Sequence, residues 1–347
     1  MTRPYALLRA GFPHVKCVGT LTILSHPIDV AVTKDLRLFV LRRFTSMGAA
    51  LNILSWDDED LGRIGEFAPS GAGGPSAEDD GKMVWPAALI LDRDENLVIS
   101  DEGRHRINFL TQDGKMINSW GEQGSGPGQL DRPSGIAFDA EGNILVVDTL
   151  NHRVQRFTKD GHFLMKWGRH GEGDGEFNMP CGITVDELGD VYVADWRNDR
   201  VQKFTTNGEF IFKFGRSGTG NGEFSRPAGV AVDTEGDIYV ADSQNDRVQL
   251  FNAEGRYVEK FIGDATLSKM ARDYMLTNAL PNRLRDMADL EPQKRFRNPR
   301  SVLVDANGRM YVPDYGSFRV QVYQKETVHL EPHQFADPQR SPSLETV

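Results

Sequence analysis

Three kinds of side chain that could recognise a ligand stand where an otherwise regular sequence pattern varies or breaks. They are arginines, one carboxylate and two aromatic residues: Arg42, Arg43, Glu102, Trp196, Arg197, Arg300 and Tyr315. Guanidinium groups bind carboxylates and phosphates through paired hydrogen bonds, and aromatic rings supply flat apolar contact. If folding brings these residues together, they could clamp an anionic or aromatic ligand or anchor a peptide.

The composition limits which partners such a site could serve. The chain has 347 residues, with 40 Lys and Arg against 50 Asp and Glu, so its formal net charge is -10. Non-specific nucleic-acid binding needs a basic surface that releases counterions, so nucleic acid is an improbable partner. The sequence shows neither a signal peptide nor an apolar run of about 20 residues that could span a membrane. We therefore expect a cytoplasmic protein without a membrane partner.

The elements that must position these residues follow from an internal repeat. The segment Pro133–Asp148 recurs as Pro180–Asp195 and Pro227–Asp242, and Pro86 opens an earlier copy 47 residues before Pro133. A later copy begins at Pro299, and a looser one at Pro27. Within a unit, short apolar runs separated by glycine-containing turns predict four antiparallel strands. Six four-stranded units in register predict an all-β fold, a β-propeller of six blades.

The segments Asp148–Phe157, Asp195–Phe204 and Asp242–Phe251 resemble NHL repeats. This resemblance to the six-bladed NHL propellers covers residues 86–262 strongly, residues 299–323 well and residues 27–85 poorly. Propellers host unrelated functions, so the resemblance implies a fold rather than a reaction. His105 and His152 stand inside the repeat at a position that these blades commonly fill with a polar residue, so we expect a structural role. The repeated Asp–Arg pairs, such as Asp148 with Arg153, are expected to be structural salt bridges.

The same resemblance bears on metals. Zinc-dependent peptidyl-hydroxyglycine lyases carry histidines just after the blade-opening prolines, and here none of those residues is histidine: Ile28, Ala87, Ser134, Cys181, Ala228 and Arg300. Propellers that resemble gluconolactonases hold calcium with several carboxylate and amide groups, whereas here the equivalent inner positions are mostly Ala, Gly and Ser, with Asp29 as the one carboxylate among them. Cys17 and Cys181 are too few for a cysteine-built site. We predict no metal and no cofactor.

The domain organisation predicted is a propeller over residues 1–325 and a Pro-rich tail over residues 326–347. Residues 12–19 should close the last blade, because His14–Val18 aligns with an outer strand; residues 327–330 are a weaker candidate for that place. Between blades 5 and 6, residues 264–298 should form a helical insertion, with Leu267 and Met270 on one face. This insertion is either packed on the rim or a lid over the channel.

A function follows if the residue after each signature aspartate faces one mouth of the channel. These residues are Arg43, Glu102, Thr149, Trp196, Ser243 and Tyr315. We expect a binding propeller that presents blades 6 and 1, under the insertion, to a protein segment or a small anionic or aromatic ligand. The alternative is a small-molecule hydrolase, lyase or isomerase with its site at the same mouth, for which no catalytic residue can be assigned. Binding of single-stranded RNA is a third, weaker hypothesis.

Overall fold

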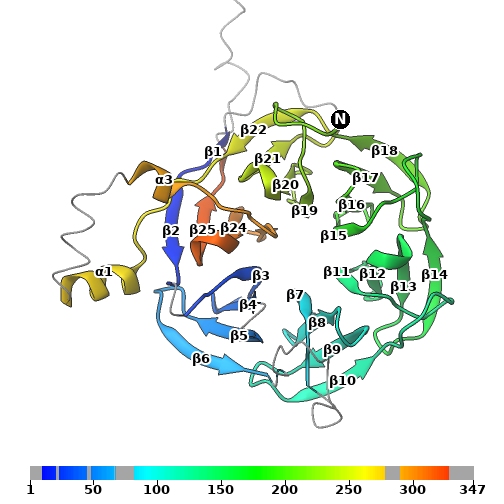
Figure 1. Cartoon of the computed structure of the whole chain (residues 1–347), viewed down its shortest axis with the longest axis horizontal. Helices are drawn as coiled ribbons and strands as arrows, with labels where there is room; N and C mark the ends of the chain where they lie inside the picture. Colours follow the sequence, from blue (N-terminus) through cyan, green and yellow to red (C-terminus); the bar gives the residue numbers. More distant parts are fainter. Residues whose placement is uncertain are drawn as a thin grey trace, which may run out of the picture.

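Six antiparallel sheets stand around a central channel in the computed structural model of the chain (Figure 1). The structure describes residues 10–20, 23–44, 48–65, 67, 82–277 and 290–327. Each sheet has four strands, and the first strand of each blade faces the channel while the fourth forms the outer rim. The predicted six-bladed propeller is therefore confirmed.

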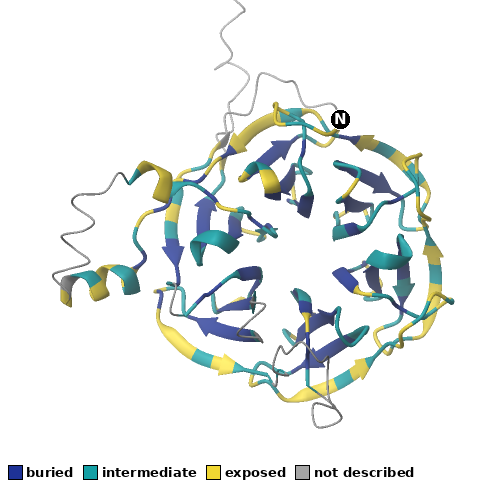
Figure 2. Ribbon diagram, viewed as in Figure 1, coloured by how far each residue is buried: buried dark blue, intermediate teal, exposed yellow. Residues whose placement is uncertain are grey.

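The fourth blade shows how the repeat builds a sheet. It consists of β15 (Pro180–Val185), β16 (Val191–Asp195), β17 (Arg200–Phe204) and β18 (Phe210–Phe214), paired in that order. Every residue of β16 and β17 is buried, because neighbouring blades cover both faces of the two middle strands. The outer strand β18 alternates between exposed and covered residues, as a strand with one solvent face should. Figure 2 shows the same gradient in the other blades, with an exposed rim around buried middle strands.

The remaining complete blades repeat this order with the following strands. They are blade 1, with β3 (Pro27–Val32), β4 (Leu38–Phe44), β5 (Gly48–Leu54) and β6 (Asp60–Ile64); blade 2, with β7 (Pro86–Leu91), β8 (Leu97–Asp101), β9 (Arg106–Leu110) and β10 (Met116–Trp120); blade 3, with β11 (Pro133–Phe138), β12 (Ile144–Asp148), β13 (Arg153–Phe157) and β14 (Phe163–Trp167); and blade 5, with β19 (Pro227–Val232), β20 (Ile238–Asp242), β21 (Arg247–Phe251) and β22 (Tyr257–Phe261).

The sixth blade combines the two ends of the chain. Its inner strands are β23 (Leu303–Val304), β24 (Arg309–Asp314) and β25 (Arg319–Gln324), and its outer strand is β2 (His14–Val18). β2 pairs antiparallel with β25, with Val18 opposite Val320. A short sheet of β1 (Ala10–Gly11) and β26 (Glu326–Thr327) follows, so Thr327 does not take the outer place in the blade. The early segment thus closes the ring and leaves no open edge on β25.

Buried ion pairs fasten each glycine-rich connector to its blade. Asp148 has no exposed surface and accepts a hydrogen bond from Arg153 Nε at 2.7 Å. The other guanidinium nitrogens of Arg153 donate to the carbonyl oxygens of Ser125, Gly126 and Gln129. The same pattern holds Arg200 to Asp195 and Arg247 to Asp242. These ion pairs are structural, since every hydrogen bond of the arginine goes to its own blade or to the connector of that blade.

The two repeat histidines join one blade to the next. His105 Nδ1 accepts the backbone N–H of Arg132 at 3.1 Å, and His152 Nδ1 accepts that of Met179 at 3.0 Å. The carboxylate of Asp199 makes the equivalent bond in the following blade. Three short helical turns accompany these junctions: η2 (Thr149–Asn151), η3 (Ser243–Asn245) and η4 (Tyr315–Ser317).

The described part of the insertion lies outside the ring. Its helices α1 (Lys269–Thr277) and α3 (Glu291–Lys294) stand beside β2 at the rim, not over the channel (Figure 1). The lid interpretation is therefore wrong for these helices: Met270 of α1 is hydrogen-bonded to Asp58 of the first blade, and Gln293 of α3 to Arg319 of β25. The remaining part of the predicted insertion, residues 278–289, falls outside the described residues. No helix that the structure describes is long and apolar enough to cross a membrane.

Candidate functional site

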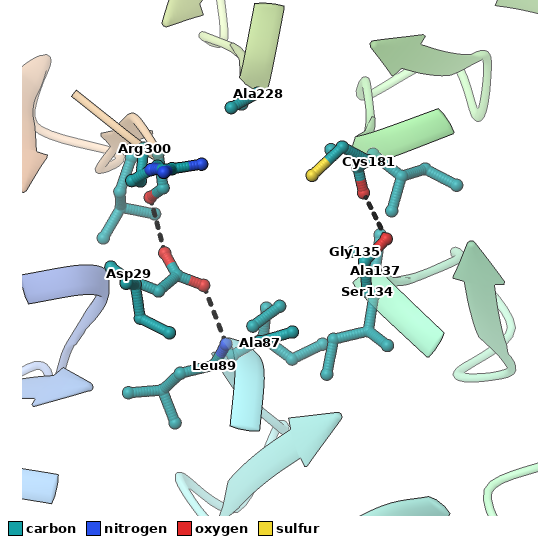
Figure 3. Close-up of a pocket in the computed structure, with 18 of the residues that line it drawn as sticks. Asp29, Ala87, Leu89, Ser134, Gly135, Ala137, Cys181, Ala228 and Arg300 are labelled. Atoms are coloured by element: carbon teal, nitrogen blue, oxygen red, sulfur yellow. Dashed lines mark hydrogen bonds between the residues drawn. The ribbon is translucent and has the colours of Figure 1, made fainter. Parts of the chain in front are cut away.

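A cavity of about 580 Å³ occupies the central channel and is lined by the first strands of all six blades (Figure 3). Most of its wall is small or branched and apolar, with a few polar and charged groups. The apolar members include Ala87, Leu89, Ala137, Ile183, Ala228 and Val230. Small-molecule sites commonly have this composition, in which apolar walls bury the body of a ligand and a few polar groups orient it.

Glycines set how closely the blades approach on one side of the channel. A Cβ atom at Gly135 would lie 2.4 Å from the carbonyl oxygen of Cys181, and one at Gly182 would lie 2.6 Å from that of Ala228. A Cβ atom at Gly229 would lie 2.7 Å from the Cα atom of Ser301. Backbone therefore packs directly on backbone from blade 3 to blade 6, and no side chain fits there.

Asp29 takes the corresponding position in blade 1 and spans the gaps to both neighbouring blades. Its Oδ1 atom accepts the hydroxyl of Ser301 at 2.5 Å and the N–H of Val30 at 3.0 Å, and its Oδ2 atom accepts the N–H of Leu89 at 2.7 Å (Figure 3). Burial raises the pKa of Asp29 to about 6, although the three hydrogen bonds act in the opposite direction. The sequence predicted that Asp29 lies near the channel, but it did not predict these contacts with both neighbouring blades.

Arg300 extends from blade 6 into the same cavity. Its guanidinium lies 5.1 Å from the ring centre of Tyr315, which also lines the cavity. The Nε atom of Arg300 is buried without a hydrogen-bond partner, and its guanidinium forms no ion pair with any residue that the structure describes. A buried donor without a partner carries a desolvation cost, so Arg300 is poised to bind an acceptor.

Arg43 and Glu102, from blades 1 and 2, lie on the adjoining part of the wall. Arg43 Nη1 is 3.3 Å from Glu102 Oε2 and 3.2 Å from the carbonyl oxygen of Pro86, to which it donates. The same guanidinium lies 5.5 Å from the ring centre of Trp85, another lining residue. Glu102 thus neutralises Arg43, whereas Arg300 keeps its charge without a described counter-ion.

Three of the residues predicted for this site do not line the cavity: Arg42, Trp196 and Arg197. Arg42 stands where the other blades have their signature aspartate, and it donates from Nε to Asn52 and from Nη1 to Ser25 inside blade 1. Trp196 and Arg197 do not line the cavity; the ring of Trp196 lies 4.8 Å from the guanidinium of Arg226. Of the seven predicted residues, the structure brings together Arg43, Glu102, Arg300 and Tyr315.

In blades 3 and 5, the residue after the signature aspartate is Thr149 or Ser243, and its hydroxyl forms a hydrogen bond to the next blade. Thr149 Oγ1 donates to the carbonyl oxygen of Pro180 at 3.0 Å, and Ser243 Oγ donates to that of Pro299 at 2.5 Å. These hydroxyls are therefore satisfied within the ring.

Cys181 faces Arg300 and Asp29 from the opposite wall (Figure 3). Burial raises the pKa of its thiol to about 11; Glu102 adds to the rise, whereas Arg300 and Arg43 oppose it. A nucleophilic cysteine needs a thiolate, so Cys181 is unsuited to nucleophilic catalysis at neutral pH. Within the described residues, no group of three or more His, Cys, Asp and Glu side chains is placed to hold a metal ion.

Sequence reasoning missed Trp85. This residue directly precedes the blade-opening Pro86, and the pre-proline position was not considered as part of the mouth. A signal existed, because the equivalent residues of the other blades are His26, Arg132, Met179, Arg226 and Asn298, and only this blade has a large aromatic residue there.

Comparison with known proteins agrees with this architecture. A family model described as a 6-bladed beta-propeller matches residues 188–274, and the NHL repeat model matches residues 130–157. No curated protein matches the chain.

Several solved structures share the fold at low sequence identity. A streptogramin B lyase has a TM-score of 0.54 at 12% identity, over 95% of this chain and 90% of that chain. Virginiamycin B lyase from Staphylococcus aureus has a TM-score of 0.54 at 12% identity, over 93% and 90% of the two chains. A protein of unknown function from Bacteroides thetaiotaomicron has a TM-score of 0.62 at 16% identity, over 92% and 77%. At such identities the likeness shows the fold alone.

Proposed function

We propose that the central channel of this six-bladed β-propeller, part of which matches the NHL repeat, binds a small organic anion. The observation that carries this proposal is Arg300, whose buried Nε has no hydrogen-bond partner and whose charge has no described counter-ion in a cavity with largely apolar walls. An anion at this guanidinium would supply the missing acceptor in a poorly solvated place, where charge-assisted hydrogen bonds are strong.

The neighbouring groups support a small ligand over a protein segment. The cavity of about 580 Å³ lies within the range of about 300–1,000 Å³ found for small-molecule sites. Tyr315 and Trp85 offer flat surfaces at its wall. Arg43 is already paired with Glu102, so among the described residues that line the cavity Arg300 is the one cation without a counter-ion. A group with a single negative charge, such as a carboxylate, fits this charge better than a doubly charged phosphate.

A catalytic use of the same cavity is the second candidate, favoured by Asp29. An acid or base works best when its pKa lies near the working pH, and the pKa of Asp29 is raised to about 6. The lyases that share the fold add nothing to this candidate beyond the fold itself. Turnover of a bound compound by the wild-type protein, lost in Asp29→Asn, would establish catalysis over binding.

The test of the proposal combines a ligand search with one pair of variants. Native mass spectrometry of the purified protein against a library of organic acids should give bound ligands. Arg300→Gln should weaken their binding by about 1.5–3 kcal/mol, roughly ten- to a hundredfold, because it removes a charged hydrogen-bond donor. Arg132→Gln is the matched control, since Arg132 is exposed and does not line the cavity.

The outcome against the proposal is equally specific. Equal affinities of wild type, Arg300→Gln and Arg132→Gln for every ligand found would place the binding site elsewhere on the molecule.

A further inference from the structure

Two opposite charges share the cavity without neutralising each other. Arg300 supplies the positive charge and Asp29 the negative one, and both line the channel. All three hydrogen bonds that Asp29 accepts come from uncharged groups, the Ser301 hydroxyl and the amides of Val30 and Leu89. Among the described residues, Asp29 forms no ion pair, and no nearby charge contributes to its raised pKa.

The pair formed by Arg43 and Glu102 in the same wall provides a contrast. Those two side chains approach to 3.3 Å and neutralise each other. A buried charge without a counter-charge is unfavourable, and raising its pKa is one way in which a carboxyl group responds. Within the part of the chain that the structure describes, Arg300 on blade 6 and Asp29 on blade 1 are therefore two separate charges without a counter-charge.

We propose that the ligand of the channel is zwitterionic, an amino-carboxylate whose carboxylate group binds Arg300 and whose ammonium group binds Asp29. This inference rests on the proposed binding of an organic anion and adds a second recognition group to it. A ligand of this class brings both missing counter-charges at once, and it leaves the net charge of the cavity unchanged.

The contacts of Asp29 leave room for such a group. A carboxylate offers about four lone-pair sites, and three hydrogen bonds from the protein occupy Asp29. Small apolar residues line the channel as well, among them Ala87 and Ala228 (Figure 3). A ligand whose two charged ends are joined by methylene groups would match a wall of this kind. The methylene groups carry no polar atoms, so none would be buried against the apolar wall without a hydrogen-bond partner.

Binding of the ammonium group should depend on pH in a defined direction. The charged or titratable groups that line the cavity with Asp29 are Arg43, Glu102, Cys181, Arg300 and Tyr315. The Cys181 thiol has its pKa raised to about 11 and stays neutral below that pH. Since the pKa of Asp29 is about 6, its carboxylate is charged above this pH, and the preference for an ammonium group should weaken as pH falls through about 6.

The test uses matched probes that differ only in the amino group. These are β-alanine and propionate, γ-aminobutyrate and butyrate, and ε-aminohexanoate and hexanoate, titrated calorimetrically at about pH 7.5 and about pH 5. In the wild type, at least one amino-carboxylate should bind about tenfold or more tightly than its partner at the higher pH, and this preference should shrink at the lower pH. The three chain lengths sample the separation between Arg300 and Asp29.

Variants separate the two recognition groups. Asp29→Asn should abolish the preference for the amino group while leaving binding of the simple carboxylates within about threefold, a free-energy change below about 1 kcal/mol. Ser301→Ala is its control, because it removes one hydrogen bond to Asp29 but keeps the carboxylate, and it should retain the preference at the higher pH. Arg300→Gln should weaken both members of every pair.

The results that overturn the inference differ from those that overturn the proposed function. Equal binding of amino-carboxylates and simple carboxylates, lost in Arg300→Gln, would leave the anion site standing and remove the role of Asp29. Binding of none of the six probes would remove the amino-carboxylate assignment, whereas the ligand search with Arg300→Gln still decides whether an anion binds. If Asp29→Asn does not fold, a preference that stays constant in the wild type between the two pH values would overturn the inference.

Discussion

Asp58 is the residue through which the closing strand, the first blade and the insertion are joined. Its carboxylate accepts the backbone N–H of Gly19 at 2.6 Å through Oδ1 and that of Met270 at 2.8 Å through Oδ2. Gly19 directly follows β2, and Met270 lies in the first turn of α1. Asp58 itself is 3% exposed and has a φ of 64°, a left-handed conformation that Asn also tolerates.

Replacing Asp58 with Asn should therefore preserve the backbone and remove one of the two bonds. An amide has one oxygen acceptor, so it can serve either Gly19 or Met270, and its NH2 group would face the other N–H as a second donor. Loss of a hydrogen bond to a charged acceptor costs about 1.5–3 kcal/mol in the free energy of unfolding. Asp58→Ala should cost about twice as much, because it removes both bonds and places a less suitable residue in the left-handed conformation.

The assay is urea-induced unfolding followed by tryptophan fluorescence, with Asp57→Asn as the control. Asp57 is the exposed neighbour, so its substitution should change the free energy of unfolding by less than about 0.5 kcal/mol. Asp58→Ala should also speed proteolytic cleavage near α1, because that helix then loses the bond to Met270 in its first turn. An unfolding free energy for Asp58→Asn equal to that of Asp57→Asn would refute the role assigned to this carboxylate.

Two further predictions concern how the ring holds together. Deleting residues 1–18 removes β2 and exposes the edge of β25, so the truncated protein should aggregate or oligomerise in size-exclusion chromatography; a monomer with an unchanged melting temperature would contradict this closure. Gly182→Ala should destabilise the fold by about 1–3 kcal/mol in urea unfolding, because its Cβ would lie 2.6 Å from the carbonyl oxygen of Ala228. Gly11→Ala is its control, since the nearest atom to that Cβ is 3.8 Å away, and equal stabilities of the two variants would show that the blades can separate without cost.

The sequence by itself determined the architecture, because each blade is built from local sequence patterns and these patterns recur along the chain. Short apolar runs, turn glycines and the Asp–Arg pairs appear in register, and each repeat is one four-stranded unit that must stack on its neighbours to bury its faces. The interpretations of His105 and His152 as structural also came from repetition, since the chain places Asp199 and Asp246 at the same point. Residue types that recur at the same position in several blades hold the blades together, so their presence does not indicate a ligand.

The candidate site was predicted only in part, because neighbouring residues on a strand point to opposite sides. Arg42 and Arg43 were indistinguishable in sequence, yet the pairing of β4 directs Arg42 toward Asn52 inside the blade and Arg43 toward Glu102 at the cavity. Trp196 shared the pattern of Tyr315 but lies against Arg226 outside the cavity. The repeat predicts the position of each residue within its blade, but it does not predict which residues of other blades that residue contacts.

Only the tertiary structure decided which charges remain uncompensated. Among the described residues Arg300 has no counter-ion, and Glu102, the carboxylate with which the sequence grouped it, pairs with Arg43 instead. The raised pKa of Asp29 comes from burial between blades 6, 1 and 2, which lie far apart in sequence at Ser301, Asp29 and Leu89. The helix α1 lies at the rim, where Asp58 accepts the backbone N–H groups of both Met270 and Gly19. Local sequence patterns specify strands and turns. The burial of a charged group and the charges around it, which set its pKa, depend on residues that only the closed ring brings together.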